Sequence, residues 1–215
     1  MTAESIIFDL DGTLWDSSES VAEAWTEALR LMDEPAVSGM TITIQDMHRI
    51  MGKTMDEIAD TLFPMLPQKE RMDILGRCME HENAYITQHG GRLFDNEEET
   101  LEKLSQSHRL FIVSNCQKGY IEAFLQFSGY GRFFADHMCW GDTEMPKSFT
   151  IKALMERCGC KSAVYVGDTQ GDCDASFDAG IPFIHAAYGF GEISTPEKVT
   201  TAIPSLTALA ECALI

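Results

Sequence analysis

Short apolar runs alternate with amphipathic stretches along most of the chain. Four runs have the length of strands and end in polar or small residues, namely SIIFDLD, RLFIVSN, AVYVGD and PFIHAAY, and a fifth, weaker run is ADHMCW. Stretches of helical periodicity lie between or after them, at residues 97–107, 118–128, 147–158 and 205–213. Continuous apolar runs are typical of strands buried on both faces, and their alternation with helices indicates a parallel sheet. The pattern therefore predicts an α/β core.

Roughly a hundred residues separate the first strand from the second, far more than a crossover between parallel strands needs. Most of this segment has a helical pattern. Residues 18–32 place an apolar stripe on one helical face, and Asp16 to Ser18 precede them as candidate N-caps. The stripe consists of Val21, Trp25, Ala28, Leu29 and Met32.

Two further helices are expected in the same segment, at residues 54–63 and 68–88, and Gly90-Gly91 offers a flexible return to the sheet. We therefore predict two parts. Residues 1–16 and 89–215 form the core, and residues 17–88 form an inserted α-helical cap.

The predicted cap is rich in methionine. It holds eight of the twelve methionines of the chain, which are Met32, Met40, Met47, Met51, Met55, Met65, Met72 and Met79. Two interpretations fit this enrichment. Methionine is an adaptable filler of helical cores, and it also makes malleable surfaces that contact ligands.

Composition fits a globular protein of 215 residues, with 45% hydrophobic and 23% charged residues. No apolar run approaches the roughly 20 residues that a membrane helix needs, so no membrane association is expected. The first residues, MTAESIIF, have neither a basic region nor a long apolar region typical of a secretory signal. We therefore expect a cytoplasmic protein.

The formal net charge of −18 argues against DNA or RNA as a partner, because binding to phosphate backbones requires clustered lysine and arginine. The seven cysteines show no paired spacing, which favours reduced thiols. A small-molecule ligand therefore fits this composition better than a nucleic acid.

Polar side chains follow the ends of the apolar runs. Asp9 and Asp11 end the first run, Ser114 and Asn115 end the second, and Asp168 ends the third. In an open parallel sheet the ligand crevice lies beyond the carboxyl ends of the strands, so these residues should converge there. Side chains two apart in a strand point to the same side, which predicts that both aspartates of the first run face the ligand.

Asp172, in the segment GDTQGD, adds a fourth carboxylate to this predicted cluster. Four neighbouring carboxylates repel one another unless a cation binds, and a site made only of oxygen ligands favours Mg²⁺. Lys147, just at the start of a predicted helix, could neutralise an anionic substrate, and Lys152 in the same helix competes for this role. A metal site, a lysine and small hydrogen-bond donors around a carboxylate nucleophile indicate phosphoryl chemistry.

Four segments occur in the order of the motifs of the haloacid dehalogenase superfamily: DLDGTL, the strand end VSN, Lys147 ahead of a helix, and GDTQGD. The chain resembles this family from residue 4 to about residue 191. The position of the insert resembles the cap of the subfamily that contains phosphoglycolate phosphatase and β-phosphoglucomutase, and AAYGFGE resembles its phosphatases. The resemblance implies a Rossmann-like three-layer core with a parallel sheet and an inserted helical cap.

The resemblance also implies roles for the two aspartates of the first motif. Asp9 attacks phosphorus and forms an aspartyl-phosphate. Asp11 protonates the leaving oxygen and later activates water. The side chains of Asp9 and Asp168 and the backbone carbonyl of Asp11 bind Mg²⁺, and Asp172 supports the water shell of the metal.

Ser114, Asn115 and Lys147 are the implied phosphate-binding residues, and the lysine also offsets the charge of the nucleophile. In the predicted cap, MGKT resembles a substrate-specificity loop, in which Gly52 turns the chain and Lys53 meets the anionic end of a substrate. An ordinary exposed loop lysine is nearly as good an interpretation of Lys53.

Several enzyme classes within the superfamily have motifs that match this sequence less well. Haloacid dehalogenases lack the second aspartate, and phosphonoacetaldehyde hydrolases replace it with a small residue, so Asp11 argues against both. We expect a Mg²⁺-dependent phosphatase of small phosphorylated metabolites, with phosphoglycolate as a candidate substrate. The alternative is a sugar phosphomutase of the β-phosphoglucomutase type, although its fourth motif usually opens with Glu-Asp rather than Gly-Asp. A catalytically inactive homologue that binds phosphate compounds is a third possibility.

Overall fold

The computed structural model describes residues 3–215, and its centre is a six-stranded sheet in which every neighbouring pair of strands is parallel. In spatial order the strands are β5 (Phe134–Cys139), β4 (Arg109–Ser114), β1 (Ser5–Phe8), β6 (Ala163–Gly167), β7 (Phe183–Ala186) and β8 (Thr201–Ile203). The five strands predicted from apolar runs are all present. β8 was not predicted because its three residues, TAI, form no apolar run.

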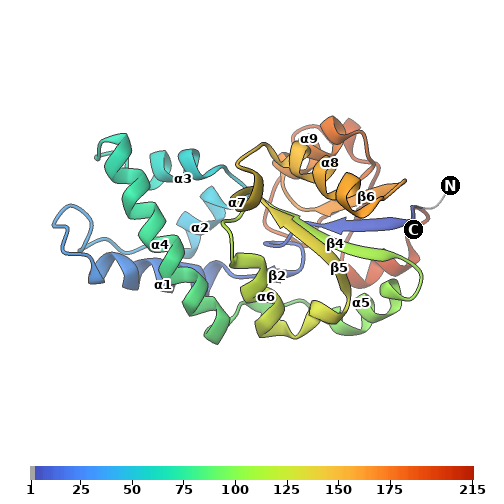
Figure 1. Cartoon of the computed structure of the whole chain (residues 1–215), viewed down its shortest axis with the longest axis horizontal. Helices are drawn as coiled ribbons and strands as arrows, with labels where there is room; N and C mark the ends of the chain where they lie inside the picture. The colour runs from blue at the N-terminus through green and yellow to red at the C-terminus, as the bar shows by residue number, and fades with distance from the viewer. Residues whose placement is uncertain (1–2) are drawn as a thin grey trace.

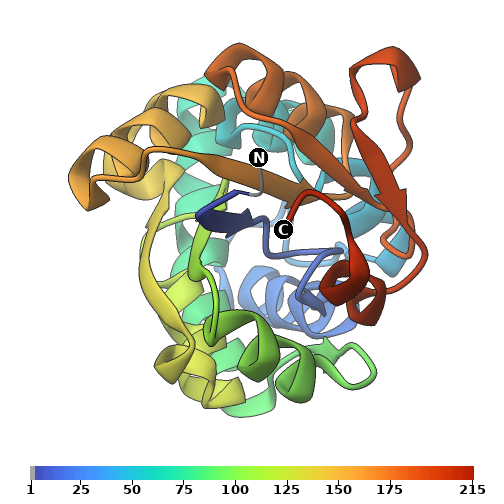
Figure 2. The same ribbon diagram turned by 90° about the vertical axis from the view of Figure 1, so that its right-hand side faces the viewer.

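The sheet is covered on both faces, which gives the predicted three layers (Figure 2). Alternation along β1 sends Ile7 to one face and Ile6 and Phe8 to the other. The helices α8 (Lys147–Cys158) and α9 (Gln170–Ala179) pack on the side of Ile7. The helices α5 (Glu97–Ser105) and α6 (Tyr120–Ser128) pack on the opposite side. The predicted Rossmann-like α/β class is therefore confirmed.

Four helices lie together at one end of the sheet (Figure 1). They are α1 (Ser18–Leu31), α2 (Ile44–Ile50), α3 (Met55–Leu62) and α4 (Gln68–His89). The predicted apolar stripe of α1 is buried, mainly against α4. The sequence did not reveal α2, because a helix of two turns that buries only Met47 and Ile50 leaves too short a periodic pattern.

The chain enters and leaves this helical segment through a two-stranded antiparallel ribbon. Strand β2 (Trp15–Asp16) pairs with β3 (Arg92–Leu93), and the Arg92 guanidinium donates to the Asp16 carboxylate at 3.1 Å. Gly90, at φ +67°, precedes the ribbon, and a Cβ there would lie 2.1 Å from the Phe127 ring. The Gly90-Gly91 segment, which was expected to be a flexible connection back to the sheet, is thus closely packed. The predicted cap boundaries, residues 17 and 88, lie next to the ribbon on its helical side. The division into core and cap stays a prediction.

The end of the chain differs from expectation. Residues 205–213 were expected to form an α-helix, and instead the 3₁₀ helix η3 (Leu206–Glu211) follows Pro204 and Ser205. Its buried residues, Leu206 and Leu209, are three apart, and side chains at that spacing align in a 3₁₀ helix. The remaining short elements are η1 (Tyr130–Arg132), α7 (Trp140–Thr143) and η2 (Pro196–Lys198).

Within residues 3–215, every helix is too short or too polar to cross a membrane.

The buried sheet predicts that replacing two phenylalanines by alanine changes the free energy of unfolding by very different amounts. Phe8 is fully buried at the centre of the sheet, whereas Phe149 on α8 is 48% exposed. We expect Phe8→Ala to lower the free energy of unfolding by about 3–5 kcal/mol, because it leaves a cavity that neighbours cannot fill. Phe149→Ala should change it by less than about 0.5 kcal/mol. Urea unfolding followed by circular dichroism tests this, and similar losses in both variants would contradict the described packing.

Candidate active site

Three neighbouring strands end at the same edge of the sheet, and each carries a predicted site residue there. Phe8 of β1 lies opposite Ile112 of β4 and Val166 of β6, so the ends of the three strands are adjacent. Asp9 follows β1, Ser114 ends β4 and Asp168 follows β6. The convergence expected from the topology is therefore present.

Three buried aspartates form a cluster at this edge. Asp9, Asp168 and Asp172 each offer one carboxylate oxygen, and these oxygens lie within 4.8 Å of one another. The sequence predicted four carboxylates in this cluster, but the side chain of Asp11 lies outside it. The strand ends at Phe8 and the chain turns, so the Asp11 carboxylate lies apart from that of Asp9 although both residues face the same cavity.

Lys147 supplies the positive charge within the cluster. Its Nζ donates to Asp9 Oδ1 at 2.8 Å and to Asp172 Oδ1 at 2.5 Å. Burial lowers the pKa of Lys147, but the carboxylates of Asp172 and Asp9 outweigh burial and raise it overall, so the ammonium stays charged. Lys152, the competing candidate, is exposed on the same helix. The geometry therefore favours Lys147.

Asp172 is fixed by its place in the first turn of α9. Its Oδ2 accepts hydrogen bonds from the backbone N–H of Thr169 at 3.0 Å and from Thr169 Oγ1 at 2.6 Å. The Asp172 N–H donates back to Thr169 Oγ1, which completes a capping box at the start of α9. The helix start thus leaves Oδ1 of Asp172 directed at Lys147.

Tyr165 was missed by the sequence reading. Its hydroxyl donates to the Val113 carbonyl at 2.7 Å and lies 3.5 Å from Asp9 Oδ1 and 3.4 Å from Asp172 Oδ1. The only signal in the sequence was one phenol in the otherwise apolar strand AVYVG.

Asp168 is held by the segment that follows β7. Its Oδ2 accepts from the backbone N–H groups of Phe190 at 3.0 Å and Gly191 at 2.9 Å. Gly12, at φ +82°, packs so closely that a Cβ there would lie 2.4 Å from the same carboxylate. The other oxygen, Oδ1, is buried and has no hydrogen-bond partner among residues 3–215.

These features fit a divalent cation. The cluster offers only oxygen donors, it contains three carboxylates and one ammonium, and it has an orphaned buried oxygen. Burial and the neighbouring Asp172 raise the pKa of Asp9 to about 7, although Lys147 opposes this shift. Burial, Asp172 and Asp9 raise the pKa of Asp168 to about 8. A bound cation would favour the ionised form of both residues.

Asp11 lies beside this cluster in a separate hydrogen-bond network. Its Oδ1 accepts from Trp15 Nε1 at 2.9 Å, Ser17 Oγ at 2.6 Å and the Tyr120 hydroxyl at 2.8 Å. Burial raises the pKa of Asp11, and these hydrogen bonds oppose the shift without cancelling it. A carboxyl group with a raised pKa is suited to donate and accept protons. Tyr120 in this network was not predicted.

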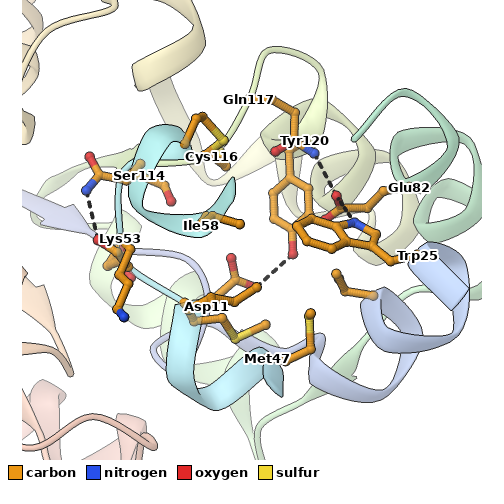
Figure 3. Close-up of a pocket in the computed structure, with 17 residues that line it drawn as sticks. Asp11, Trp25, Met47, Lys53, Ile58, Glu82, Ser114, Cys116, Gln117 and Tyr120 are labelled. Atoms are coloured by element: carbon orange, nitrogen blue, oxygen red, sulfur yellow. Dashed lines mark hydrogen bonds between the residues drawn. The ribbon is translucent and has the colours of Figure 1, made fainter. Parts of the chain in front are cut away.

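A cavity, partly open to solvent, joins this edge of the sheet to the helical segment (Figure 3). Asp9, Asp11, Ser114 and Asn115 line it from the sheet side. The helical side contributes mostly apolar groups, among them Met47, Met51 and Met55, whereas Met32 is buried in the helical core. Met47 and Met55 are also buried in the same hydrophobic core as Met32, so the interpretation as core filler is confirmed for them, and contact with a ligand stays a prediction.

Gly52 and Lys53, between α2 and α3, also line the cavity. Gly52 has φ +79°, which confirms the predicted turn. The Asn115 side-chain amide donates to the Gly52 carbonyl at 3.0 Å, so Asn115 also joins the sheet edge to this loop. Three further lining residues, Trp25, Glu82 and Gln117, were not predicted as site residues, because only tertiary packing brings them together.

Comparison with known proteins gives one family. A family model described as haloacid dehalogenase-like hydrolase matches residues 6–186. A phosphoglycolate phosphatase of Vibrio parahaemolyticus is 27% identical, over 94% of this chain and 93% of its own. The phosphoglycolate phosphatase of Escherichia coli K12 is 24% identical, over 94% of this chain and 90% of its own.

A solved structure shares the fold over nearly the whole chain. It is a haloacid dehalogenase-like family hydrolase from Streptococcus pneumoniae, with a TM-score of 0.79 and 20% identity, and the match covers 97% of each chain.

The lysine within the acidic cluster predicts a specific loss of stability. Lys147→Met leaves Asp9 and Asp172 buried without a cation, and we expect it to lower the free energy of unfolding by about 3–5 kcal/mol at neutral pH. Lys152→Met removes the same charge from the exposed side of the same helix and should have little effect. Urea unfolding measures both, and equal effects would show that the buried pairing does not stabilise the fold.

The raised pKa of Asp168 predicts a pH dependence in metal-free protein. Its carboxyl keeps a proton up to about pH 8 in the folded state, whereas the unfolded chain releases it near pH 4. The free energy of unfolding should therefore fall as pH rises through this window. We expect Asp168→Asn to flatten this fall, as measured by urea unfolding at several pH values in EDTA. An unchanged slope in the variant would contradict the raised pKa.

Proposed function

Because the chain belongs to the haloacid dehalogenase-like hydrolases, we propose that it is a Mg²⁺-dependent phosphatase that hydrolyses small phosphate monoesters through an aspartyl-phosphate. The main support is the placement of Asp9, which lines the cavity and is held by Lys147 inside an acidic cluster. A carboxylate fixed by a lysine on one oxygen can present its other oxygen to an electrophile.

Asp9 is the proposed nucleophile. Lys147 binds its Oδ1, and within residues 3–215 its Oδ2 accepts no hydrogen bond. An oxygen of Asp9 bonds to phosphorus while the bond from phosphorus to the leaving oxygen breaks, and Asp11 donates a proton to that oxygen. Asp11 then takes a proton from water as the water attacks phosphorus, which frees Asp9 and inorganic phosphate. The raised pKa of Asp11 suits both proton transfers.

The proposed metal ligands are the side chains of Asp9 and Asp168 and the backbone carbonyl of Asp11, with Asp172 supporting the site. Mg²⁺, when bound, supplies positive charge that offsets the negative charge of the phosphoryl group. Ser114, Asn115 and Lys147 are the proposed phosphate-binding residues. Of these, Lys147 has the best support, because its ammonium is already next to Asp9.

The curated relatives named above are phosphoglycolate phosphatases, which makes phosphoglycolate a candidate substrate. We assign substrate choice to the cap, residues 17–88, because its helices supply most of the apolar cavity wall. Lys53 is the proposed contact for an anionic group of the substrate. A cytoplasmic location stays a prediction from the sequence.

Replacing the nucleophile tests the proposal. Asp9→Asn should lower phosphate release at least about a thousandfold, because an amide cannot form the covalent intermediate. The substitution Asp33→Asn, at an exposed position away from the cavity, is the matched control and should leave the rate unchanged. The measurement is phosphate release from p-nitrophenyl phosphate and a panel of phosphorylated metabolites, with Mg²⁺ and with EDTA. Activity retained by Asp9→Asn, or by the wild type after complete metal removal, would refute the mechanism.

A further inference from the structure

A buried glutamate lines the cavity on the side opposite Lys53 (Figure 3). Glu82 lies on α4, and its Oε2 accepts hydrogen bonds from Trp25 Nε1 at 2.6 Å and from Gln117 Nε2 at 3.1 Å (Figure 3). These donors come from α1 and from the segment after β4, so three distant parts of the chain fix one carboxylate. Such a fixed orientation is typical of a group that recognises a ligand.

The second oxygen of this carboxylate is free. Both hydrogen bonds go to Oε2, and among the residues that the structure describes Oε1 accepts none. Glu82 is only 3% exposed, yet it lines the cavity, and it takes part in no ion pair within residues 3–215. Buried charges in proteins are normally paired. A positively charged group that pairs with ionised Glu82 must therefore reach it through the cavity.

Among the described residues that line the cavity, no positively charged side chain lies beside Glu82. The cavity wall is largely apolar, with Val21, Ile50 and Ile58 among its residues. Lys53 is the lysine that lines the cavity, and Figure 3 shows its ammonium on the opposite side from Glu82. Burial raises the pKa of Glu82 to about 8, so its ionised form is costly until a positive group arrives.

We propose that this side of the cavity binds the leaving group of the substrate, and that the leaving group has an apolar body ending in a protonated amine. The ammonium donates a hydrogen bond to Oε1 of Glu82 and pairs with its charge, while the apolar body contacts the methionine and isoleucine side chains. This inference rests on the proposed function, because it places the phosphate of the same molecule at Asp9.

The inference distinguishes this chain from the activity in the names of its relatives. The leaving group of phosphoglycolate is a two-carbon carboxylate, which has neither the apolar body nor the ammonium inferred here. A carboxylate beside Glu82 would oppose the ionisation of Glu82 and would lack the charge pairing that an ammonium gains there. We therefore expect phosphoglycolate to be a poorer substrate than an aminoalkyl phosphate.

A matched substrate series tests this assignment. The series consists of aminoalkyl phosphates of increasing chain length, each compared with the plain alkyl, hydroxyalkyl and carboxyalkyl phosphates of the same length. We expect kcat/KM for the best aminoalkyl phosphate to exceed that of its alkyl counterpart about tenfold or more, through a lower KM. The carboxyalkyl phosphate should be the poorest member. A preference for the alkyl, hydroxyalkyl or carboxyalkyl compound, or no preference, would overturn the inference.

Two variants assign the preference to Glu82. Glu82→Gln keeps the shape and an oxygen that accepts from Trp25, and it should reduce the ratio of aminoalkyl to alkyl kcat/KM to about one. Glu80→Gln removes a charge from the exposed side of the same helix and should keep the wild-type ratio. A wild-type ratio in Glu82→Gln would overturn the assignment. The wild-type series tests the amine preference without any variant, whether or not Glu82→Gln folds.

Hydrolysis of p-nitrophenyl phosphate separates this inference from the proposed function. If the wild type with Mg²⁺ hydrolyses neither this ester nor any member of the series, the proposed phosphatase activity fails. If it hydrolyses the simple ester but does not favour the amines, only the inference about Glu82 fails.

Discussion

The ammonium of Lys147, placed between the carboxylates of Asp9 and Asp172, is the interaction on which the site depends. Removing ions from water costs several kcal/mol each, so three neighbouring buried carboxylates can all be ionised only with positive charge among them. One lysine leaves the cluster with excess negative charge when all three carboxylates are ionised. Several features fix this arrangement: the start of α8 places the lysine, the capping box of α9 orients Asp172, and two backbone N–H groups hold Asp168. The fold thus maintains an electrostatic imbalance that a divalent cation can correct.

Much of the core and of this cluster could be predicted from the sequence, because both follow from chain order. Apolar runs identify strands, and parallel strands necessarily bring their carboxyl ends to one edge, so Asp9 and Asp168 could be placed without coordinates. Predictions failed where a local rule was extended too far. Asp11 was expected to add a fourth carboxylate to the acidic cluster, but β1 ends at Phe8 and the Asp11 carboxylate accepts a hydrogen bond from Tyr120, while the residue still lines the cavity as predicted. Glu82 could not be predicted as a site residue for a different reason, because only the packing of α1 on α4 brings Trp25 next to it.

The two walls of the cavity have different origins and different chemistry. The sheet side is polar and charged, and its groups are positioned by strand ends and helix starts. The helical side is largely apolar, with Glu82 as its buried carboxylate. The hydrogen bond from Asn115 to Gly52 joins the two walls directly. The acidic cluster and the apolar wall are therefore encoded in separate stretches of the chain, which meet around one cavity.

The antiparallel ribbon of β2 and β3 has a consequence for how such a protein evolves. Both ends of the inserted segment leave the sheet side by side, with Asp16 paired to Arg92, so the insertion occupies a single point on the perimeter. Helices can be lengthened, shortened or exchanged beyond that point without any change in the spacing that the sheet must accommodate. A lineage can thereby acquire new specificities by recombination at one junction while it inherits an unchanged reaction centre.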